Sequence, residues 1–261
     1  MNWLYIAPLW VSGPLLLVVL VGLAVLGLLA VRKWVLPRIH VTHSDSHFVG
    51  PIVHSVMVFY GLMLGLIAVN VFETYGQAKH IVTAEAAAIA ALYRDTSGYP
   101  EPTRSDLRAA LTDYVEYTIY TVWPAHRAGK VPAGGVDRMD RFEAYLANFE
   151  PTTEAEKVLH GETWRAFNDF IVARRTRLDR VQEALPGVMW FVVLLGAGVS
   201  LCASFFFHVP DVKLHVILVS LLATFIASVI FVTLAMDHPF RGDLGITPES
   251  YELIYHQVMK H

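Results

Sequence analysis

The feature of this 261-residue sequence that most constrains its fold is a set of four long runs without Asp, Glu, Lys or Arg. The runs are Met1–Val31, Ser46–Phe72, Ala184–Pro210 and Leu214–Met236. A helix needs about 20 apolar residues to cross the ~30 Å hydrocarbon core of a bilayer, and each run is long enough. They predict four membrane-spanning helices, at roughly 15–31, 51–72, 187–208 and 214–235.

The first run is expected to be a retained anchor. A secretory signal has a basic beginning, a short apolar core and a small-residue cleavage site. Met1–Val31 has none of these three features and ends at Arg32 and Lys33. We therefore expect both termini on the same side of the membrane.

The charged residues are concentrated in one part of the chain. Of the 43, 31 lie between Glu73 and Glu183, which predicts a single polar insert between the second and third spans. The formal net charge of -3 leaves no basic excess to neutralise phosphates, so no nucleic-acid partner is expected. Cys202 is the single cysteine, which excludes intrachain disulfides and cysteine-based zinc sites.

The insert has the start and stop signals of helices. The second span has no breaker at its end and leads into the Ala-rich stretch Thr83–Leu92, so its helix is expected to continue beyond the membrane. Ser97–Pro102 breaks the chain, and Thr103 with Asp106 resembles a capping box. The apolar series that follows predicts a second helix through Leu107, Leu111, Val115, Ile119 and Val122.

The rest of the insert continues this pattern. Residues 129–135 are predicted as a loop, 136–149 as a short helix, and Pro151–Glu154 as the start of a long helix that runs to Pro186. One face of the helix that leaves the second span is expected to pack on this last helix, within the subunit or between neighbours, through Val82, Ala86, Ile89 and Tyr93. The small alanines around them permit close approach.

The predicted fold is therefore an all-α polytopic membrane protein with four transmembrane helices and a helical insert. Its segments are 1–72 with the first two spans, 73–185 as the insert, 186–236 with the last two spans, and 237–261 as a tail with a short amphipathic helix. No cofactor is expected.

Orientation rests on the Lys and Arg residues near the span ends. The side of the short loops carries Arg32, Lys33, Arg38 and Lys213, whereas the insert side carries Lys79, Arg174, Arg175, Arg177, Arg180 and Arg241. The small excess favours an insert and termini in the cytoplasm, with the loop around residues 38–48 outside.

Five sequence pieces occur in a characteristic order. They are Glu73-x-Tyr75-x-x-Ala78, Glu85-Ala86 followed by Ala91-Leu92-Tyr93-Arg94, Trp123-Pro124, Arg174-Arg175-x-Arg177-Leu178, and Asp237-His238-Pro239-Phe240-Arg241-Gly242. In this order the chain resembles a bacterial family of bestrophin-like membrane proteins. That family usually has Arg in place of His238, a departure that weakens a charge-based role for the last piece.

The resemblance implies an architecture and a function. Bestrophins are oligomeric ion channels with a helical cytoplasmic vestibule, so it implies a cytoplasmic insert, self-association, with a pentamer as one candidate, and inorganic ions as cargo. It also implies residence in a bacterial inner membrane, with the lipid bilayer as a partner. No enzymatic activity is implied, and the sequence contains no nucleophile elbow, Walker loop, Rossmann glycine triplet or His-Glu-x-x-His helix.

The second span carries the candidate pore residues. At 100° per residue, one narrow stripe contains Ser55, Phe59, Leu62, Leu66, Asn70 and Glu73. Its apolar middle suits a constriction that gates by dewetting, and Asn70 and Glu73 would face a hydrated vestibule. The alternative is that the stripe packs on the first or third span, with Asn70 bonded to a neighbouring helix.

Three further groups have both a functional and a structural interpretation. His40, His43 and His47, with Asp45 and His54, have spacings that a metal ion or a pH sensor can use, or they form an exposed polar loop. The band Arg174, Arg175, Arg177 and Arg180 either contacts lipid headgroups or rings an ion vestibule. The family motif Asp237, Pro239, Phe240, Arg241 and Gly242 is interpreted as a membrane-exit turn, with a positive φ at Gly242.

Two function classes remain. One is a homo-oligomeric ion channel whose pore is lined by the second spans, since four spans in one subunit are too few to enclose a wide pathway. The other is a non-conducting membrane scaffold or sensor whose helical insert binds a partner protein.

Overall fold

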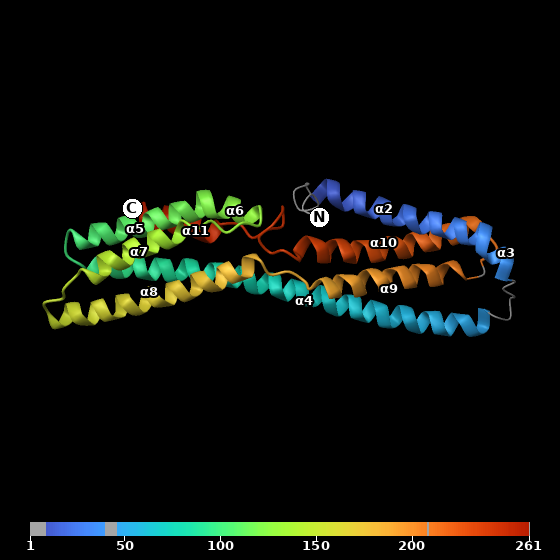
Figure 1. Cartoon of the computed structure of the whole chain (residues 1–261), viewed down its shortest axis with the longest axis horizontal. Coiled ribbons are helices and arrows are strands. Elements are labelled where there is room, and N and C mark those ends of the chain that lie inside the picture. Colours follow the sequence, from blue (N-terminus) through green and yellow to red (C-terminus); the bar gives the residue numbers. More distant parts are fainter. Residues whose placement is uncertain (1–8, 40–45, 208, 261) are drawn as a thin grey trace. The chain divides into compact units, whose positions relative to one another are not determined.

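A computed structural model describes residues 9–39, 46–207 and 209–260 (Figure 1). The described residues form helices joined by turns and contain no strand, which confirms the all-α prediction. Four helices are long and apolar enough to cross a membrane: Trp10–Arg38, Val53–Gly98, Gly187–Phe205 and Val212–Met236. These correspond to the four predicted spans.

The chain divides into two compact units. Unit 1 contains residues 1–73 and 184–237, and unit 2 contains residues 74–183 and 238–261. Residues 237–261 were predicted to form a separate tail, whereas residues 238–261 belong to unit 2. The physical reason is burial, because Phe240, Ile246, Tyr251, Tyr255 and Met259 all join the core of that unit.

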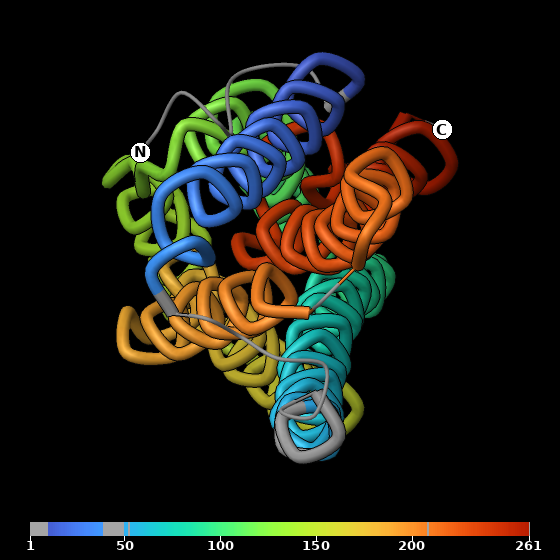
Figure 2. The backbone as a smooth tube through the Cα atoms, turned by 90° about the vertical axis from the view of Figure 1, so that its right-hand side faces the viewer, coloured from blue at the N-terminus to red at the C-terminus, as the bar shows by residue number. Residues whose placement is uncertain are grey.

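Unit 1 contains four long helical segments, drawn as tubes in Figure 2. They are α2 (Leu9–Ala30), the first part of α4 (Ser46–Asp95), α9 (Gly187–Phe205) and α10 (Val212–Met236). A five-residue π-helix η1 (Val31–Val35) and α3 (Leu36–Ile39) continue α2. Most of the large side chains on their outer faces are exposed, as expected for a lipid-facing surface.

Close approach within unit 1 depends on glycine. A Cβ at Gly196 of α9 would lie 2.3 Å from the ring of Tyr60 in α4, and one at Gly13 of α2 would lie 2.9 Å from Phe231 in α10. Tyr60 also donates its hydroxyl to the carbonyl of Val193, at 3.2 Å. The glycines thus make room for an aromatic ring of the facing helix, which allows the helices to approach closely.

Unit 2 is built on the second part of α4, which continues as one helix to Asp95 as predicted. The other elements are η2 (Thr96–Gly98), α5 (Thr103–Tyr117), η3 (Thr118–Val122), α6 (Trp123–Arg127), α7 (Gly135–Ala147), α8 (Glu154–Val181), α11 (Glu249–Ile254) and η4 (Tyr255–Met259). The predicted apolar series from Leu107 to Val122 is buried throughout. Val82, Ile89 and Tyr93 of α4 share one core with Phe167 and Phe170 of α8, as predicted.

Two helix boundaries differ from the predictions. Thr103 is the first residue of α5 and makes no cap, because the preceding Pro102 occupies the cap position without a side-chain hydrogen bond. The last insert helix ends at Val181 rather than at Pro186. Beyond it the backbone amide of Leu185 donates to the carboxylate of Asp237, at 2.6 Å, instead of continuing the helix.

Candidate functional site

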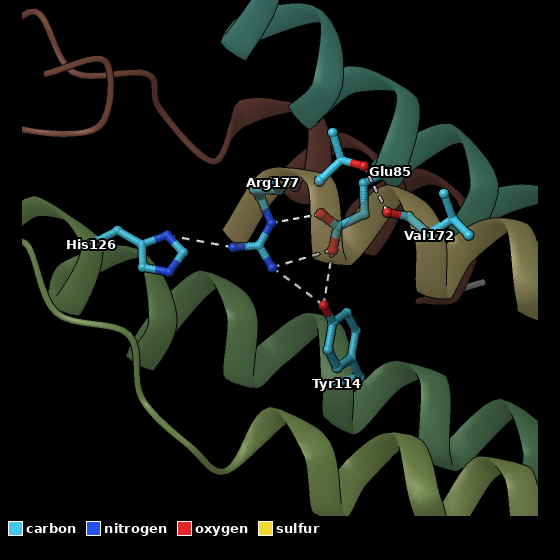
Figure 3. Close-up of polar contacts among 6 residues, drawn as sticks. Glu85, Tyr114, His126, Val172 and Arg177 are labelled. Carbon is cyan, nitrogen blue, oxygen red and sulfur yellow. Dashed lines mark hydrogen bonds and ion pairs between the residues drawn. The ribbon is translucent and has the colours of Figure 1, made fainter. Parts of the chain in front are cut away.

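An ion pair lies in the interior of unit 2, between Glu85 of α4 and Arg177 of α8 (Figure 3). Their side chains are 0% and 1% exposed. The guanidinium Nε donates to Glu85 Oε2 at 2.6 Å, and Nη2 donates to Oε1 at 3.2 Å. This two-point geometry is the strong form of an arginine–carboxylate contact.

Both residues occupy positions that helical periodicity assigns to the core. Glu85 follows Val82 by one turn and precedes Ile89 by one turn, and both neighbours are buried. Arg177 precedes the buried Val181 by four residues on α8. A charge on a buried helical face is costly unless it is paired, so each residue requires the other.

Four polar or aromatic groups complete the surroundings of the guanidinium. Tyr114 of α5 donates its hydroxyl to Glu85 Oε1 at 2.9 Å and accepts from Arg177 Nη2 at 3.3 Å. His126 of α6 presents Nδ1 to Arg177 Nη1 at 3.4 Å, as Figure 3 shows. The rings of Trp123 and Tyr251 lie 5.5 and 5.9 Å from the guanidinium carbon. We call these six residues the buried polar centre.

Burial holds three titratable groups of this centre in single protonation states. Burial, together with the positive charge of Arg177, lowers the pKa of His126 to about 3, so the imidazole is neutral at neutral pH. Burial, together with the charge of Glu85, raises the pKa of Tyr114. The pKa of Tyr251 is raised mainly by burial. The centre therefore holds one ion pair and offers no accessible acid or base, which is the chemistry of a structural core.

The C-terminal motif begins in unit 1. Asp237 accepts hydrogen bonds from the backbone amide of Leu185, at 2.6 Å, and from Trp190 Nε1, at 3.2 Å. It is 6% exposed. Asp237 thus joins the end of α10 to the segment that precedes α9.

The remainder of the motif is the predicted turn. Gly242 has a φ of +70°, as predicted, and the amide of Ile246 donates to the carbonyl of Pro239 at 2.8 Å. Phe240 is 1% exposed and lies against Trp123 and His126, with ring centroids 6.1 and 5.7 Å away.

The turn also places the guanidinium of Arg241 against Gly129. A Cβ added to Gly129, whose φ is +72°, would lie 2.4 Å from Arg241 Nη2. Four pieces of the sequence resemblance therefore meet in unit 2, through Glu85, Trp123, Arg177 and Phe240.

The arginine band is not a single surface. Arg177 was predicted to contact headgroups or a vestibule, and this prediction is wrong because its side chain is enclosed and paired with Glu85. Arg175 is exposed, Arg174 is half-buried beside Gly135, and Arg180 is half-buried and bonded to Glu183. Periodicity gives the reason, since Arg177 lies on the core face of α8 and Arg175 does not.

The candidate pore stripe on α4 lies on the surface of the subunit. Phe59, Leu62 and Leu66 are 72%, 61% and 63% exposed, and the polar residues of the stripe, Ser55, Asn70 and Glu73, are exposed as well. The opposite face, with Tyr60 and Leu64, is buried against α9 and α10. The alternative that this stripe packs on the first or third span of its own subunit is therefore wrong for its apolar middle.

The predicted metal site falls mostly outside the described residues. His40, His43 and Asp45 are not described, and nothing is described of the side chain of His47. His54 is exposed. Among the described residues no group of three potential metal ligands occurs. A metal or pH-sensing role for this loop stays a prediction.

The buried polar centre was not predicted from the sequence. Glu85 and Trp123 entered only as parts of the resemblance, Arg177 was assigned to the arginine band, and Tyr114, His126 and Tyr251 were not singled out. One signal was available, because Glu85 shares a helical face with Val82 and Ile89 and a carboxylate there needs a partner. The identity of that partner was not readable from the pattern.

Comparison with known proteins gives one match. The family model of the Bestrophin-like domain matches residues 18–251. No curated protein and no solved structure is significantly similar to the chain. The matched range includes the buried polar centre, the α4 stripe and the C-terminal motif.

Proposed function

The chain belongs to the bestrophin-like domain family, and on this basis we propose that it is the subunit of a homo-oligomeric ion channel whose pore is lined by α4. Subunits must share an axis for this function, because four spans are too few to enclose a wide pathway alone. A pentamer is one candidate assembly. The proposed location is a bacterial inner membrane, with the insert and both termini in the cytoplasm.

The observation that carries the proposal is the exposed stripe of α4. Among the described residues no helix covers its apolar middle, Phe59, Leu62 and Leu66, while the opposite face is buried against α9 and α10. The stripe becomes polar at Asn70 and Glu73. The exposed faces of α2 and α9 have no comparable change from apolar to acidic over their length.

This order of residues suits conduction. Rings of Phe59, Leu62 and Leu66 around an axis would form a hydrophobic constriction that gates by dewetting. A ring of Glu73 carboxylates at the exit would favour cations. Arg174, Arg175 and Arg180 are proposed to contact lipid headgroups or to line the vestibule. Arg177 is excluded from this set because it is buried and paired with Glu85.

Ion flux from liposomes that contain the purified protein tests the proposal. We expect Phe59→Ala or Leu66→Ala to raise flux while oligomer size is unchanged, because each widens the constriction. Phe225→Ala is the matched control, since Phe225 is a 66% exposed phenylalanine on α10 outside the stripe. It should leave flux unchanged.

Selectivity supplies the second measurement. Glu73→Lys should shift the preference from cations toward anions, because it reverses the charge at the exit. If Phe59→Ala and Glu73→Lys both leave conductance and selectivity unchanged in a correctly assembled protein, α4 does not line the pore. Absence of flux across salts and pH would instead favour the scaffold whose insert binds a partner.

Orientation is tested separately. In a Cys202→Ser background, a cysteine replaces Gly134 in the insert or Ser44 in the loop after the first span. An impermeant thiol reagent on intact cells should label position 44 and not position 134. The reverse pattern would invert the proposed topology.

A further inference from the structure

A second polar cluster lies in unit 1, at the turn between α9 and α10. Arg32 of η1 donates from Nη1 to the carbonyl of Val209 at 3.0 Å and from Nη2 to the carbonyl of Pro210 at 3.4 Å. The same Nη1 lies 3.3 Å from Nδ1 of His215, in the first turn of α10. One arginine thus holds both the turn and the histidine that follows it.

His215 is 2% exposed, and both of its ring nitrogens have partners. Nδ1 faces Arg32, and Nε2 lies 3.1 Å from the carbonyl oxygen of Ser204, near the end of α9. A guanidinium can only donate and a carbonyl can only accept. The two contacts are therefore satisfied together by one form of the ring, the neutral tautomer with its proton on Nε2.

Protonation of this ring is incompatible with the cluster. A proton on Nδ1 removes the acceptor that Arg32 uses and places an imidazolium 3.3 Å from a guanidinium. Like charges at this distance repel strongly where water is scarce. The repulsion pushes the guanidinium away from the ring, and the same guanidinium holds Val209 and Pro210.

Two exposed cations and one carboxylate are the other charged groups nearby. Lys33, next to Arg32, and Lys213, on the first turn of α10, are both exposed cations. Asp211 accepts from the backbone amide of Lys213, at 2.8 Å. The apolar neighbours from the packed helices include Met57 of α4. Among the described residues, Arg32 is the charged side chain that contacts the ring.

A cavity lies beside the cluster. It has a volume of about 350 Å³, and its lining combines apolar side chains with the residues of the cluster: Met57, Ser204, Phe207, Val209, His215, Leu218, Val219 and Leu222. His215 and Val209 are both part of its wall. The cavity is already partly open, and release of the turn would displace this part of its wall.

We propose that Arg32 and His215 form a proton-operated clamp on the α9–α10 turn. The clamp is closed while His215 is neutral. Protonation of His215 opens it and releases the two parts of the adjoining cavity wall that the cluster holds, Val209 and His215. This device does not depend on conduction, so it can be tested whether or not the oligomer is a channel.

Electron paramagnetic resonance of a spin label on the turn tests the clamp. The label is attached to Val209→Cys in a Cys202→Ser background, in the full-length protein in liposomes. Between about pH 8 and about pH 5 we expect a several-fold rise in its accessibility to a water-soluble paramagnetic reagent. The His215→Gln variant cannot gain the proton and should show no transition.

Two further variants keep the test decisive. His54→Gln removes an exposed histidine of α4 and should leave the transition intact. Arg32→Gln removes the tether, so accessibility should already be high at about pH 8 and should not change on acidification. The proposal is overturned by an unchanged transition in His215→Gln, by no transition in the parent down to about pH 4, or by low accessibility in Arg32→Gln at about pH 8.

Discussion

The helices of unit 1 meet through glycines and a few aromatic rings, whereas those of unit 2 meet around large buried side chains and an ion pair. The helix α4 passes through both units, and its two halves show this difference. Between Val56 and Phe72 it has many exposed large apolar side chains, and over its described residues after Phe72 it has none. The first half of α4 therefore suits contact with lipid, and the second half suits contact with water.

The comparison also explains where polar groups are buried. In the proposed topology unit 2 lies in water, where apolar burial is favourable and can support a fully enclosed Glu85–Arg177 pair. In unit 1 the surrounding lipid is already apolar, so close approach and hydrogen bonds carry more of the association. Tyr60 against Gly196 is an example of both.

The largest effect is expected when the ion pair of unit 2 is broken. Arg177→Met leaves the Glu85 carboxylate buried without its partner, and loss of one member of a buried pair costs about 3–5 kcal/mol. We expect a large fall in the thermal midpoint measured by tryptophan fluorescence in detergent, because Trp123 adjoins the site. Adding Glu85→Gln should restore part of the loss.

The control for this prediction is Arg175→Met, because Arg175 is exposed on the same helix. It should change the midpoint little. Equal effects of the two substitutions on the thermal midpoint would mean that the buried Arg177 contributes no more to stability than the exposed Arg175.

The next effect tests the glycine contacts of unit 1. Gly196→Ala forces a Cβ to within 2.3 Å of the Tyr60 ring unless the helices separate. Overpacking of this kind costs about 1–3 kcal/mol. Gly198→Ala is the matched control, since nothing lies within 4 Å of its added Cβ. Thermal stability in detergent should fall for Gly196→Ala alone, and equal behaviour would refute close packing at Tyr60.

The smallest effect is a pH dependence confined to unit 2. The pKa of His126 is lowered to about 3 by burial and by Arg177, against ~6.5 in an unfolded chain. The unfolded state therefore binds more protons in this range, and stability falls as the pH drops below ~6.5, by up to about 1.4 kcal/mol per pH unit. Burial also lowers the pKa of His160, which adds a slope of the same sign.

Chemical denaturation between about pH 7 and about pH 5 measures this slope. His126→Gln should flatten it, whatever its effect on absolute stability. His80→Gln removes an exposed histidine of α4 and should leave the slope as it is. A slope that survives His126→Gln unchanged would assign the acid sensitivity to other groups.

Much of the fold was predictable because it depends on local features. Runs free of charged residues located the four long apolar helices, and Pro151–Glu154 located the start of α8, where Thr153 and Glu156 form a capping box. The end of α8 was not predictable, because the amide of Leu185 is taken by Asp237, 52 residues away. Helix ends are decided by such partners as much as by propensity.

The candidate sites divide in the same way. The sequence by itself determined the stripe from Ser55 to Glu73, because helical geometry places those residues on one face. Only the tertiary structure decided that its apolar middle stays uncovered in the subunit and that Arg177 is enclosed rather than exposed. Arg177 meets Glu85 across 92 residues, and Arg32 meets His215 across 183. Burial and pairing depend on what packs against a helix from elsewhere in the chain, and periodicity alone does not specify that partner.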